Sequence, residues 1–247
     1  MTQAVLIAGG KGERLRPVTY EIAKAMIPVH GRTLIDHNID LFWKYKIYEI
    51  WLSLGYRQED IRAKYDYPFW IDFNDERRIV PLGTGSWANK LAHDNETKKL
   101  FSKDFFVCNV DNLFDFNLDA FMKTHKENNF VVTIAATKTK DVREYGSIHC
   151  KDDKVLSFEE KKKSRIKKSG WVNSGFYIFS PKVFKYIQEL KMDKYKPMSL
   201  EKDLFPYLAK KGVLGVYKDE NSPWFDTGTF ERWEKVIKEW RGISDND

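Results

Sequence analysis

A glycine-rich loop directly after a short apolar segment most constrains the fold of this chain. Residues 3–8 (QAVLIA) form an apolar run of strand length, and three glycines follow within residues 9–17. A short apolar run that ends in glycine is typical of a buried parallel strand. Glycines after such a strand let the backbone approach a phosphate closely and direct amide donors toward it. The loop therefore predicts an α/β fold with a phosphate-binding site.

Two familiar phosphate loops do not match this segment. A P-loop needs Ser or Thr after its lysine, whereas Gly12 follows Lys11. The dinucleotide-binding fingerprint needs glycine where Leu15 stands. A glycine turn without a ligand also leaves the surrounding cations unexplained, which are Lys11, Arg14, Arg16 and Lys24.

Strand-like and helical patterns alternate over the first ~130 residues, which predicts a mainly parallel, doubly wound sheet. Strands are expected at 48–54, 69–73 and 104–110, and helices at 33–46, where Thr33 and Asp36 have capping-box form, and 57–65. Closely spaced strand-like runs then predict an antiparallel insertion, at 130–136, 145–150, 154–158 and 171–179. The remaining expectations are a strand at 213–217 and helices at 180–190, 199–210 and 228–240. The helix at 180–190 is expected to begin at Ser180-Pro181 and to bury Val183, Phe184, Ile187 and Leu190.

Composition excludes several classes of protein. The 42 Lys and Arg exceed the 36 Asp and Glu, giving a net charge of +6, which fits a soluble surface or phosphate-rich substrates. No dedicated nucleic-acid module is recognisable. Cys108 and Cys150 form no CxxC pair, so neither a disulfide framework nor a zinc site is expected. Without a targeting segment or an apolar run of ~18 residues, the sequence predicts a cytoplasmic protein with no membrane partner.

Residues 6–19 (LIAGGKGERLRPVT) resemble the opening signature of the sugar-1-phosphate nucleotidyltransferases. That signature is a strand, then GGxGxRLxPLT, then a Pro-Lys-Pro segment whose lysine falls here at Lys24. Ala23 and Ala25 stand in place of the two prolines, and Glu13 in place of the usual Thr. Six later motifs resemble the family in the same order, at 80–86 (VPLGTGS), 106–111 (FVCNVD, with Val110 for glycine), 145–148 with 158–161 (YGSI and FEEK), 171–179 (WVNSGFYIF), 199–203 (SLEKD) and 224–229 (WFDTGT).

The resemblance implies a Rossmann-like, doubly wound, mainly parallel sheet with a small antiparallel sugar-binding insertion. No Pro/Gly/Ser linker or internal repeat interrupts the chain. We therefore expect one nucleotidyltransferase domain over 1–247, with a nucleotide-binding core at 1–130 and the sugar-binding part and closing helices at 131–247.

The resemblance also implies a role for particular residues. Asp111 and Asp226 are the expected Mg²⁺ ligands, and hard carboxylate oxygens suit that ion. Arg14, Lys24, Asp111 and Lys161 are the expected catalytic residues, with Arg14 on pyrophosphate, Lys24 on the α-phosphate and Lys161 on the sugar phosphate. The expected nucleotide contacts are Leu6, Ala8, Gly9, Gly10, Gly12, Arg14, Lys24, Gly83, Thr84 and Asp111. The expected sugar contacts are Tyr145, Gly146, Glu160, Lys161, Asn173, Gly175 and Glu201. Asn173 could instead be a turn or strand-edge residue, and Glu201 could instead favour a helix dipole.

The implied reaction joins a nucleoside triphosphate to a sugar 1-phosphate, releasing pyrophosphate. Residues 81–85 and 157–161 look most like guanylyltransferases of mannose- or heptose-1-phosphate, so GTP is favoured. Alternatives within the family are a uridylyl-, thymidylyl- or cytidylyltransferase, including a phosphocholine cytidylyltransferase. Outside it, a metal-dependent glycosyltransferase and a catalytically silent nucleotide-sugar binding protein remain open. The expected partners are the two substrates, with a homodimer as an option.

Overall fold

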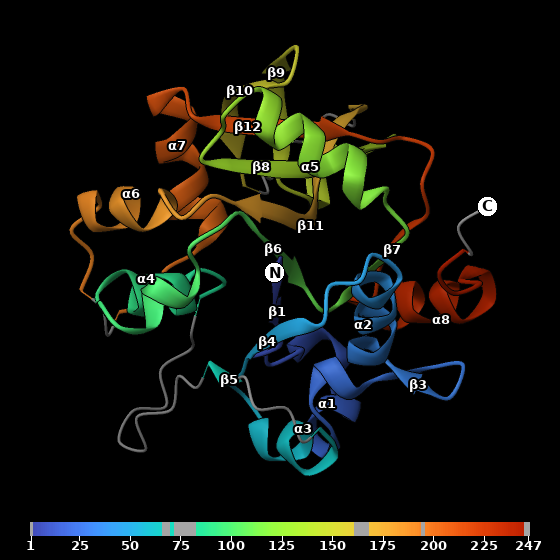
Figure 1. The fold of residues 1–247 in the computed structure, drawn as a ribbon. Helices are drawn as coiled ribbons and strands as arrows, with labels where there is room; N and C mark the ends of the chain where they lie inside the picture. The colour runs from blue at the N-terminus through green and yellow to red at the C-terminus, as the bar shows by residue number, and fades with distance from the viewer. Residues whose placement is uncertain (1, 66–69, 72–82, 161–167, 194–195, 245–247) are drawn as a thin grey trace. The chain divides into compact units, whose positions relative to one another are not determined.

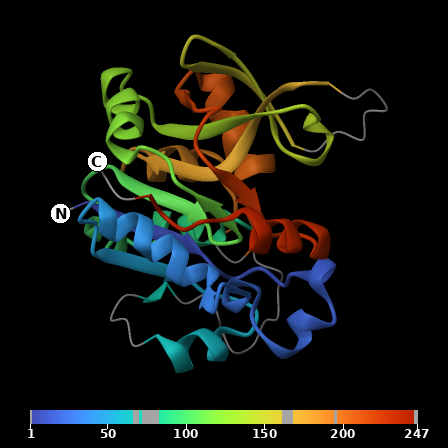
Figure 2. The same cartoon turned by 90° about the vertical axis from the view of Figure 1, so that its right-hand side faces the viewer.

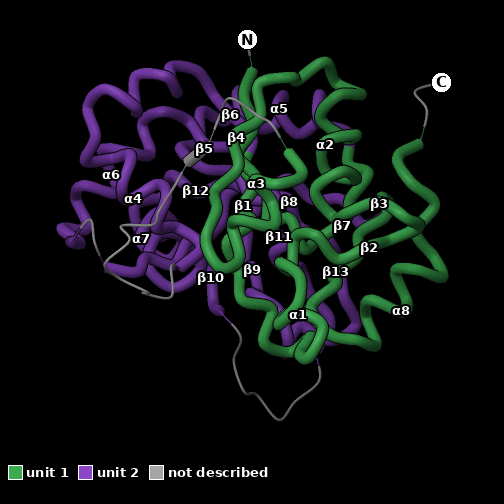
Figure 3. The backbone as a smooth tube through the Cα atoms, turned by 90° about the horizontal axis from the view of Figure 1, so that it is seen from below, with its two compact units in different colours: residues 1–79, 107–116, 222–247 green, residues 80–106, 117–221 purple. Residues whose placement is uncertain are grey.

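The computed structural model describes residues 2–65, 70–71, 83–160, 168–193 and 196–244. The chain divides into two compact units, and both are discontinuous in sequence (Figure 3). Unit 1 comprises Met1–Ile79, Val107–Phe116 and Ser222–Asp247, and unit 2 comprises Val80–Phe106 and Asn117–Asn221.

A parallel sheet organises unit 1 (Figure 1). Strand β1 (Gln3–Ile7) pairs in parallel with β4 (Glu49–Ser53), and β4 pairs in parallel with β5 (Trp70–Ile71). β6 (Phe105–Asn109) follows β1 in the strand order β5-β4-β1-β6. The strands expected at 3–8, 48–54 and 104–110 are confirmed to within one or two residues at each end. Of the strand expected at 69–73, β5 forms the described part, and residues 69, 72 and 73 lie outside the described ranges.

Two small antiparallel ladders account for the other strands in the described part of unit 1. β2 (Pro28–Val29) pairs with β3 (Arg32–Thr33), and β7 (Asn112–Phe114) pairs with β13 (Trp224–Asp226). The β7–β13 register places Asn112 directly opposite Asp226. This ladder joins a segment after β6 to a segment more than a hundred residues later.

The helices of unit 1 are α1 (Val18–Glu21), α2 (Leu34–Lys44), α3 (Gln58–Lys64) and α8 (Phe230–Glu239), with 3-10 turns at Glu13–Leu15 and Lys24–Met26. The expected capping box is confirmed, because the Thr33 side chain accepts from the Asp36 amide and Asp36 accepts from the Thr33 amide. Helix α8 begins at Phe230 with Thr229 as its N-cap, two residues later than expected.

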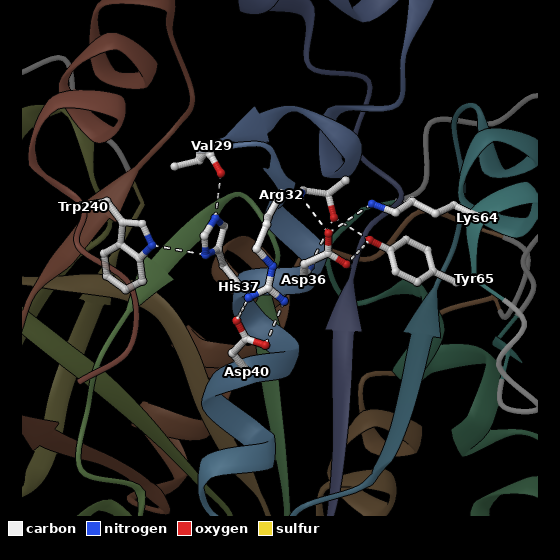
Figure 4. Close-up of polar contacts among 9 residues, drawn as sticks. Val29, Arg32, Asp36, His37, Asp40, Lys64, Tyr65 and Trp240 are labelled. Carbon is white, nitrogen blue, oxygen red and sulfur yellow. Dashed lines mark hydrogen bonds and ion pairs between the residues drawn. The ribbon is translucent and has the colours of Figure 1, made fainter. Parts of the chain in front are cut away.

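A fully buried cluster holds these elements of unit 1 together. Its members come from the segments between β1 and α2, from α2 and β7, and from α8 and the residue after it. They are Leu15, Ile27, Val29, Leu34, Leu113, Val236 and Trp240. Trp240 also donates its indole N–H to His37 Nδ1 at 3.3 Å, and His37 Nε2 bonds the Val29 carbonyl at 3.0 Å (Figure 4). The indole N–H can only donate, so Nδ1 carries no proton, and the carbonyl can only accept, so Nε2 carries one. The His37 ring is therefore neutral.

Unit 2 is built on a mixed sheet with the strand order β11-β8-β12-β10-β9. Its strands are β8 (Val132–Thr139), β9 (Ser147–Lys151), β10 (Lys154–Glu159), β11 (Gly170–Phe179) and β12 (Leu214–Lys218). The expected antiparallel texture is confirmed for β8 with β11 and for β9 with β10, while β12 runs parallel to β8. β9 also pairs with β11.

The helices of unit 2 are α4 (Ser86–Ala92), α5 (Leu118–Glu127), α6 (Val183–Glu189) and α7 (Phe205–Lys211), with 3-10 turns at Thr97–Leu100 and Val142–Glu144. Helices α5 and α7 cover opposite faces of the sheet (Figures 1 and 2). The helix expected at 199–210 is a π-helical turn (Leu200–Leu204) that leads into α7.

The start expected for the helix at 180–190 is wrong. Ser180 and Pro181 form a turn before α6, and Lys182 occupies the N-cap position. Val183, Phe184 and Ile187 are buried as expected, but Leu190 lies after the last helical residue and is half-buried. None of the helices in the described ranges is both long and apolar enough to cross a membrane.

Candidate active site

The expected site residues fall into two sets, one in each unit. Unit 1 holds Leu6, Ala8, Gly9, Gly10, Gly12, Arg14, Lys24, Asp111 and Asp226. Unit 2 holds Gly83, Thr84, Tyr145, Gly146, Glu160, Asn173, Gly175 and Glu201. Lys161 lies outside the described residues, as do residues 80–82 of the 80–86 motif.

The glycine-rich loop of unit 1 depends on glycine at two positions for different reasons. A Cβ on Gly9 would lie 3.1 Å from the backbone of Gly55, two residues beyond the neighbouring strand β4, which is a tight contact. Gly12 has φ 62°, and its Cβ would lie 2.8 Å from the Thr19 side chain and 3.1 Å from Lys24 Cβ. Positive φ and this close approach together require glycine at position 12. The Gly12 carbonyl accepts from Thr19 Oγ1 at 2.9 Å, which ties the loop to α1.

The charged side chains of the loop have distinct surroundings. Leu15 is fully buried, so the exposed residues around it, Arg14 and Arg16, are anchored at their backbone. Arg16 pairs with Glu13 at 3.7 Å and lies over the Tyr20 ring at 4.9 Å. Glu13, which stands in place of the Thr of the family signature, is thus an exposed ion-pair partner of Arg16.

The segment around Lys24 is held by an acid from helix α3. The Ala23 amide donates to Asp60 Oδ2 at 2.9 Å, and the same oxygen accepts from Arg57 Nε at 2.5 Å. The hydrogen bond from Arg57 is the main cause that lowers the pKa of Asp60. Ala23 and Ala25, on either side of Lys24 in the sequence, are both buried. A proline at position 23 could not donate this hydrogen bond.

Asp111 lies in the turn between β6 and β7 and forms an ion pair with Lys24. The Lys24 side chain is 13% exposed and that of Asp111 is 30% exposed, so the pair is largely sheltered. Burial alone would raise the pKa of Asp111, but the positive charges of Lys24 and Arg14 outweigh it and the pKa lies below its usual value. Asp111 is therefore ionised at neutral pH and available to bind a cation.

Asp226, the last residue of β13, has two partners. Its Oδ1 accepts from the Gly228 amide at 2.6 Å, and its Oδ2 accepts from Arg232 on α8. A Cβ on Gly228 would lie 2.7 Å from both Arg14 Nη2 and Asp226 Oδ1. The absence of a side chain at position 228 therefore lets the Arg14 guanidinium approach Asp226. Arg14, Lys24, Asp111 and Asp226 are thus brought together within unit 1.

The donor set of this cluster fits a magnesium ion. Asp226 lies opposite Asn112 in the β7–β13 ladder, and Asp111 directly precedes Asn112, so both can supply carboxylate oxygens. Mg²⁺ is usually bound by one or two carboxylates, with waters and phosphates completing its octahedron. Within the described part of the chain no three His, Cys, Asp or Glu side chains converge on one point, so a purely protein-bound metal cage is not formed there.

In unit 2, Thr84 and Glu201 are in direct contact. Thr84 Oγ1 donates to Glu201 Oε2 and accepts from the Leu200 amide at 3.0 Å. A Cβ on Gly83 would lie 2.1 Å from the Met198 carbonyl oxygen, so only glycine fits there. Ser199, the N-cap of the π-helical turn, also donates to Glu201 Oε2, at 2.8 Å.

A second group in unit 2 gathers Gly146, Glu160, Asn173 and Gly175. The backbone N–H of Asn173 donates to the Gly146 carbonyl at 2.8 Å, and a Cβ on Gly146 would lie 3.0 Å from Glu160 Oε2. Asn173 Oδ1 accepts from the Gly175 amide at 2.8 Å across a bulge in β11, where Gly175 has φ 82°. The Asn173 side chain therefore has a structural role in the bulge, in addition to any role on a sugar. Tyr145 is half-buried directly before this group.

Four residues of these clusters were not singled out from the sequence, namely Asn38, Tyr177, Thr227 and Arg232. Tyr177 is fully buried and its hydroxyl accepts from Asn173 Nδ2 at 2.9 Å. Arg232 is the partner of Asp226, and the only signal for it was its place one turn into a helix after the 224–229 motif. Asn38 and Thr227 bond the backbone around Asp111. Asn38 carries no sequence signal, whereas Thr227 lies inside the recognised motif.

Curated relatives match most of this chain. It is 30% identical over 235 residues to a mannose-1-phosphate guanylyltransferase catalytic subunit beta of Dictyostelium discoideum, with 92% of this chain and 61% of that protein covered. It is 29% identical over 256 residues to a UTP–glucose-1-phosphate uridylyltransferase of Synechocystis sp., with 98% of this chain and 62% of that protein covered. The chain thus spans about three fifths of the length of these relatives.

Solved structures share the fold over the whole chain. A putative glucose-1-phosphate thymidylyltransferase from Bacillus anthracis superposes with a TM-score of 0.79 at 21% identity, covering 100% of this chain and 98% of that one. HddC from Yersinia pseudotuberculosis, complexed with GMP-PN, gives a TM-score of 0.75 at 26% identity, covering 98% and 100%. These likenesses confirm the expected α/β, Rossmann-like fold class.

The family model described as nucleotidyl transferase matches residues 3–241. That range includes the glycine-rich loop, the Lys24–Asp111 pair and Asp226. The chain belongs to the nucleotidyl transferase family, as its motifs predict.

Proposed function

We propose that this protein transfers a nucleotidyl group from a nucleoside triphosphate, with GTP favoured, to a mannose- or heptose-type sugar 1-phosphate. The products are an NDP-sugar and pyrophosphate, and Mg²⁺ is the metal. The observation that carries the proposal is the cluster of unit 1 in which two carboxylates, Asp111 and Asp226, lie among the cations Lys24, Arg14 and Arg232.

This cluster suits phosphoryl chemistry better than acid–base chemistry. A sugar-phosphate oxygen is already a nucleophile, so an enzyme of this class has to position two anions and neutralise their charge. Mg²⁺ held by Asp111 and Asp226 would withdraw charge from the phosphate oxygens. Arg14 presents a planar fork of donors suited to the leaving pyrophosphate, and Lys24 supplies a point charge for the α-phosphate.

The residues of unit 2 are proposed to hold the remaining parts of the two substrates. Gly83 and Thr84 would contact the nucleotide, and the carboxylates of Glu160 and Glu201 would accept hydrogen bonds from sugar hydroxyls. The side-chain NH₂ of Asn173 uses one of its two N–H donors on Tyr177, and its second N–H would donate to a sugar hydroxyl. Lys161 would neutralise the sugar phosphate. The cytoplasmic location, the single domain over 1–247 and the homodimer stay predictions.

The choice of base rests on two kinds of likeness. Support for GTP comes from the guanylyltransferase relatives and from the GMP-PN complex of HddC. A uridylyltransferase acting on glucose 1-phosphate is the second candidate, because a relative of that description matches at nearly the same identity. Since the chain spans about three fifths of these relatives, their activities are proposals for it.

Pyrophosphate release over a grid of nucleoside triphosphates and sugar 1-phosphates tests the proposal. We expect GTP with mannose- or heptose-type 1-phosphates to give the fastest release. Binding of triphosphate without any pyrophosphate release would establish the silent binding protein instead. A fastest rate with UTP and glucose 1-phosphate would establish the second candidate.

Substitutions in the cluster test the roles of its residues. Asp111→Asn and Arg14→Ala should each lower turnover by about a hundredfold or more, because each removes a charge that meets the phosphates. Asp115→Asn is the matched control, since the Asp115 side chain is 8% exposed and pairs with Lys44 at 3.3 Å in the same unit. A folded Asp111→Asn protein with normal turnover would remove Asp111 from the proposed metal site.

A further inference from the structure

Three successive backbone carbonyls around Asp111 are held by side chains from distant parts of unit 1. The chain leaves β6 at Asn109 and turns before β7 begins at Asn112. The carbonyls of Val110 and Asn112 both accept from Asn38 Nδ2 at 3.2 Å. The carbonyl of Asp111 accepts twice from Thr227, from its amide at 3.0 Å and from its Oγ1 at 2.8 Å. The backbone on both sides of the acid is therefore held.

Asn38 is suited to this position by its carboxamide. It lies in the middle of α2 and is 2% exposed. Its Nδ2 also lies 2.9 Å from the Leu34 carbonyl, so its two N–H donors are shared among three carbonyls. Its Oδ1 lies 3.5 Å from Cys108 Sγ, where it accepts from the thiol. Burial raises the pKa of Cys108, so the thiol keeps its proton and remains a donor. The amide orientation is thus set from both ends, with only the NH₂ group facing the carbonyls.

Thr227 joins the two acids through the backbone. It is fully buried and directly follows Asp226, while its hydroxyl and amide both bond the carbonyl of Asp111. The β7–β13 ladder ends at the same place, with Asn112 opposite Asp226. One residue therefore fixes the backbone of Asp226 against that of Asp111.

We propose that Asn38 and Thr227 are positioning residues that preset the carboxylates of Asp111 and Asp226 for one divalent cation. This inference rests on the proposed function, because it assumes that these two acids bind the metal. Mg²⁺ demands nearly ideal octahedral geometry, so a small backbone shift at either acid weakens its binding. Outer partners of metal ligands typically change metal affinity by 10- to 100-fold when they are removed.

The test compares matched variants of Thr227. Thr227→Val keeps the shape but removes the hydroxyl donor, and Thr227→Ser keeps the donor. Mn²⁺ binding by electron paramagnetic resonance, with a non-hydrolysable GTP analogue, reads the metal site without turnover. We expect Thr227→Val to lower Mn²⁺ affinity about tenfold or more and Thr227→Ser to stay near wild type. Binding of the analogue without metal should be unchanged in both.

A buried hydroxyl outside the site separates positioning from stability. Thr133 is fully buried in unit 2 and bonds His125 Nδ1 at 2.7 Å, so Thr133→Val should lose stability without losing Mn²⁺ affinity. Asn38→Asp, which replaces the donors by an oxygen, should act like Thr227→Val. If Asn38→Asp does not fold, the Thr227 pair decides alone.

Several results would overturn the inference. One is wild-type Mn²⁺ affinity in folded Thr227→Val, and another is an equal loss of affinity in Thr133→Val. Mn²⁺ binding that Asp111→Asn leaves unchanged would also overturn it, because the metal would then lie elsewhere. By contrast, a wild-type protein that binds Mn²⁺ through Asp111 but releases no pyrophosphate would refute the proposed function and leave the positioning roles in place.

Discussion

At the scale of single residues, Asp60 restrains the backbone at Ala23, where the family signature has a proline before Lys24. Ala23 has φ −60° and ψ 140°, values that proline also adopts, and its amide is held by Asp60. The preceding Ile22 has φ −134° and ψ 150°, which suits a residue before proline. The family's proline restricts this backbone through its ring, whereas here a hydrogen bond from α3 restrains it.

Because a hydrogen bond takes the place of the proline ring, we expect the effect of Ala23→Pro on the free energy of unfolding to depend on whether Asp60 is present. Ala23→Pro in the wild type should cost about 1 kcal/mol or more, because Asp60 loses a donor and the ring carbon occupies its place. In an Asp60→Ala background the same change should be neutral or stabilising by up to about 1 kcal/mol, because proline restricts the unfolded chain. Urea unfolding of the four proteins measures the cycle, and equal effects in both backgrounds would contradict it.

At the scale of elements, helix α2 organises unit 1 through side chains on several of its turns (Figure 4). Its first turn carries Asp36, which accepts from Tyr65 at 2.7 Å and from Lys64 at 3.1 Å. Its second turn carries His37, bonded to Val29 and Trp240, and Asn38. Asp40 forms a two-pronged pair with Arg32. The helix therefore links β2, α3, the end of the chain and the Asp111 turn.

Asp36 should make the stability of the protein depend on acidity in a defined range. Burial alone would raise the pKa of Asp36, but hydrogen bonds from Tyr65, Thr33 and Lys64 lower it from 3.8 to about 2. Because the folded pKa is the lower one, this stabilisation is present above pH 4 and is lost as pH falls toward 2. It amounts to about 2 kcal/mol.

Asp36→Asn should accordingly be less stable than wild type at pH 7, with the difference shrinking between pH 4 and pH 2. Chemical unfolding at a series of pH values measures this difference. Asp40→Asn is a suitable control, since its ion pair with the exposed Arg32 should contribute less than about 1 kcal/mol. A difference for Asp36→Asn that stayed constant down to pH 2 would rule out the ionised capping box as its source.

At the scale of the whole molecule, both units are assembled from separate stretches of sequence. The last stretch of unit 1 brings Asp226, Thr227 and α8 to the loop and to Asp111. A triphosphate with Mg²⁺ would bind only after these stretches have come together. Under the proposed function, ligand binding and folding are therefore coupled, and binding to the folded state alone should raise stability.

GTP with Mg²⁺ should raise the unfolding temperature in a concentration-dependent manner. At a ligand concentration of 100 times Kd the gain is about 2.7 kcal/mol. Asp111→Asn and Arg14→Ala should lose most of this gain, while Asp115→Asn should keep it. Thermal unfolding with and without ligand measures the effect, and an unchanged gain in Arg14→Ala would remove Arg14 from the triphosphate site.

Much of the fold could be predicted because its signals are local. The apolar runs of β1, β4 and β6 and the capping box of α2 follow from neighbouring residues, and the structure has all of them. The misplaced start of α6 shows the limit of such signals, since Ser180-Pro181 can begin a helix or form a turn before one. The π-helical turn before α7 likewise has no periodic signature.

The sequence by itself determined the family, the glycine loop and the identity of the charged groups, because motif order and residue chemistry are properties of the chain. Only the tertiary structure decided how the backbone around Lys24 and Asp111 is held. Asp60 meets Ala23 across 37 positions, Asn38 meets Val110 across 72, and Thr227 meets Asp111 across 116. Such contacts depend on how α2, α3, β7 and β13 pack, and no local pattern encodes them. The loop that first indicated a phosphate site is therefore one part of a proposed site, and distant segments of the chain supply its other residues.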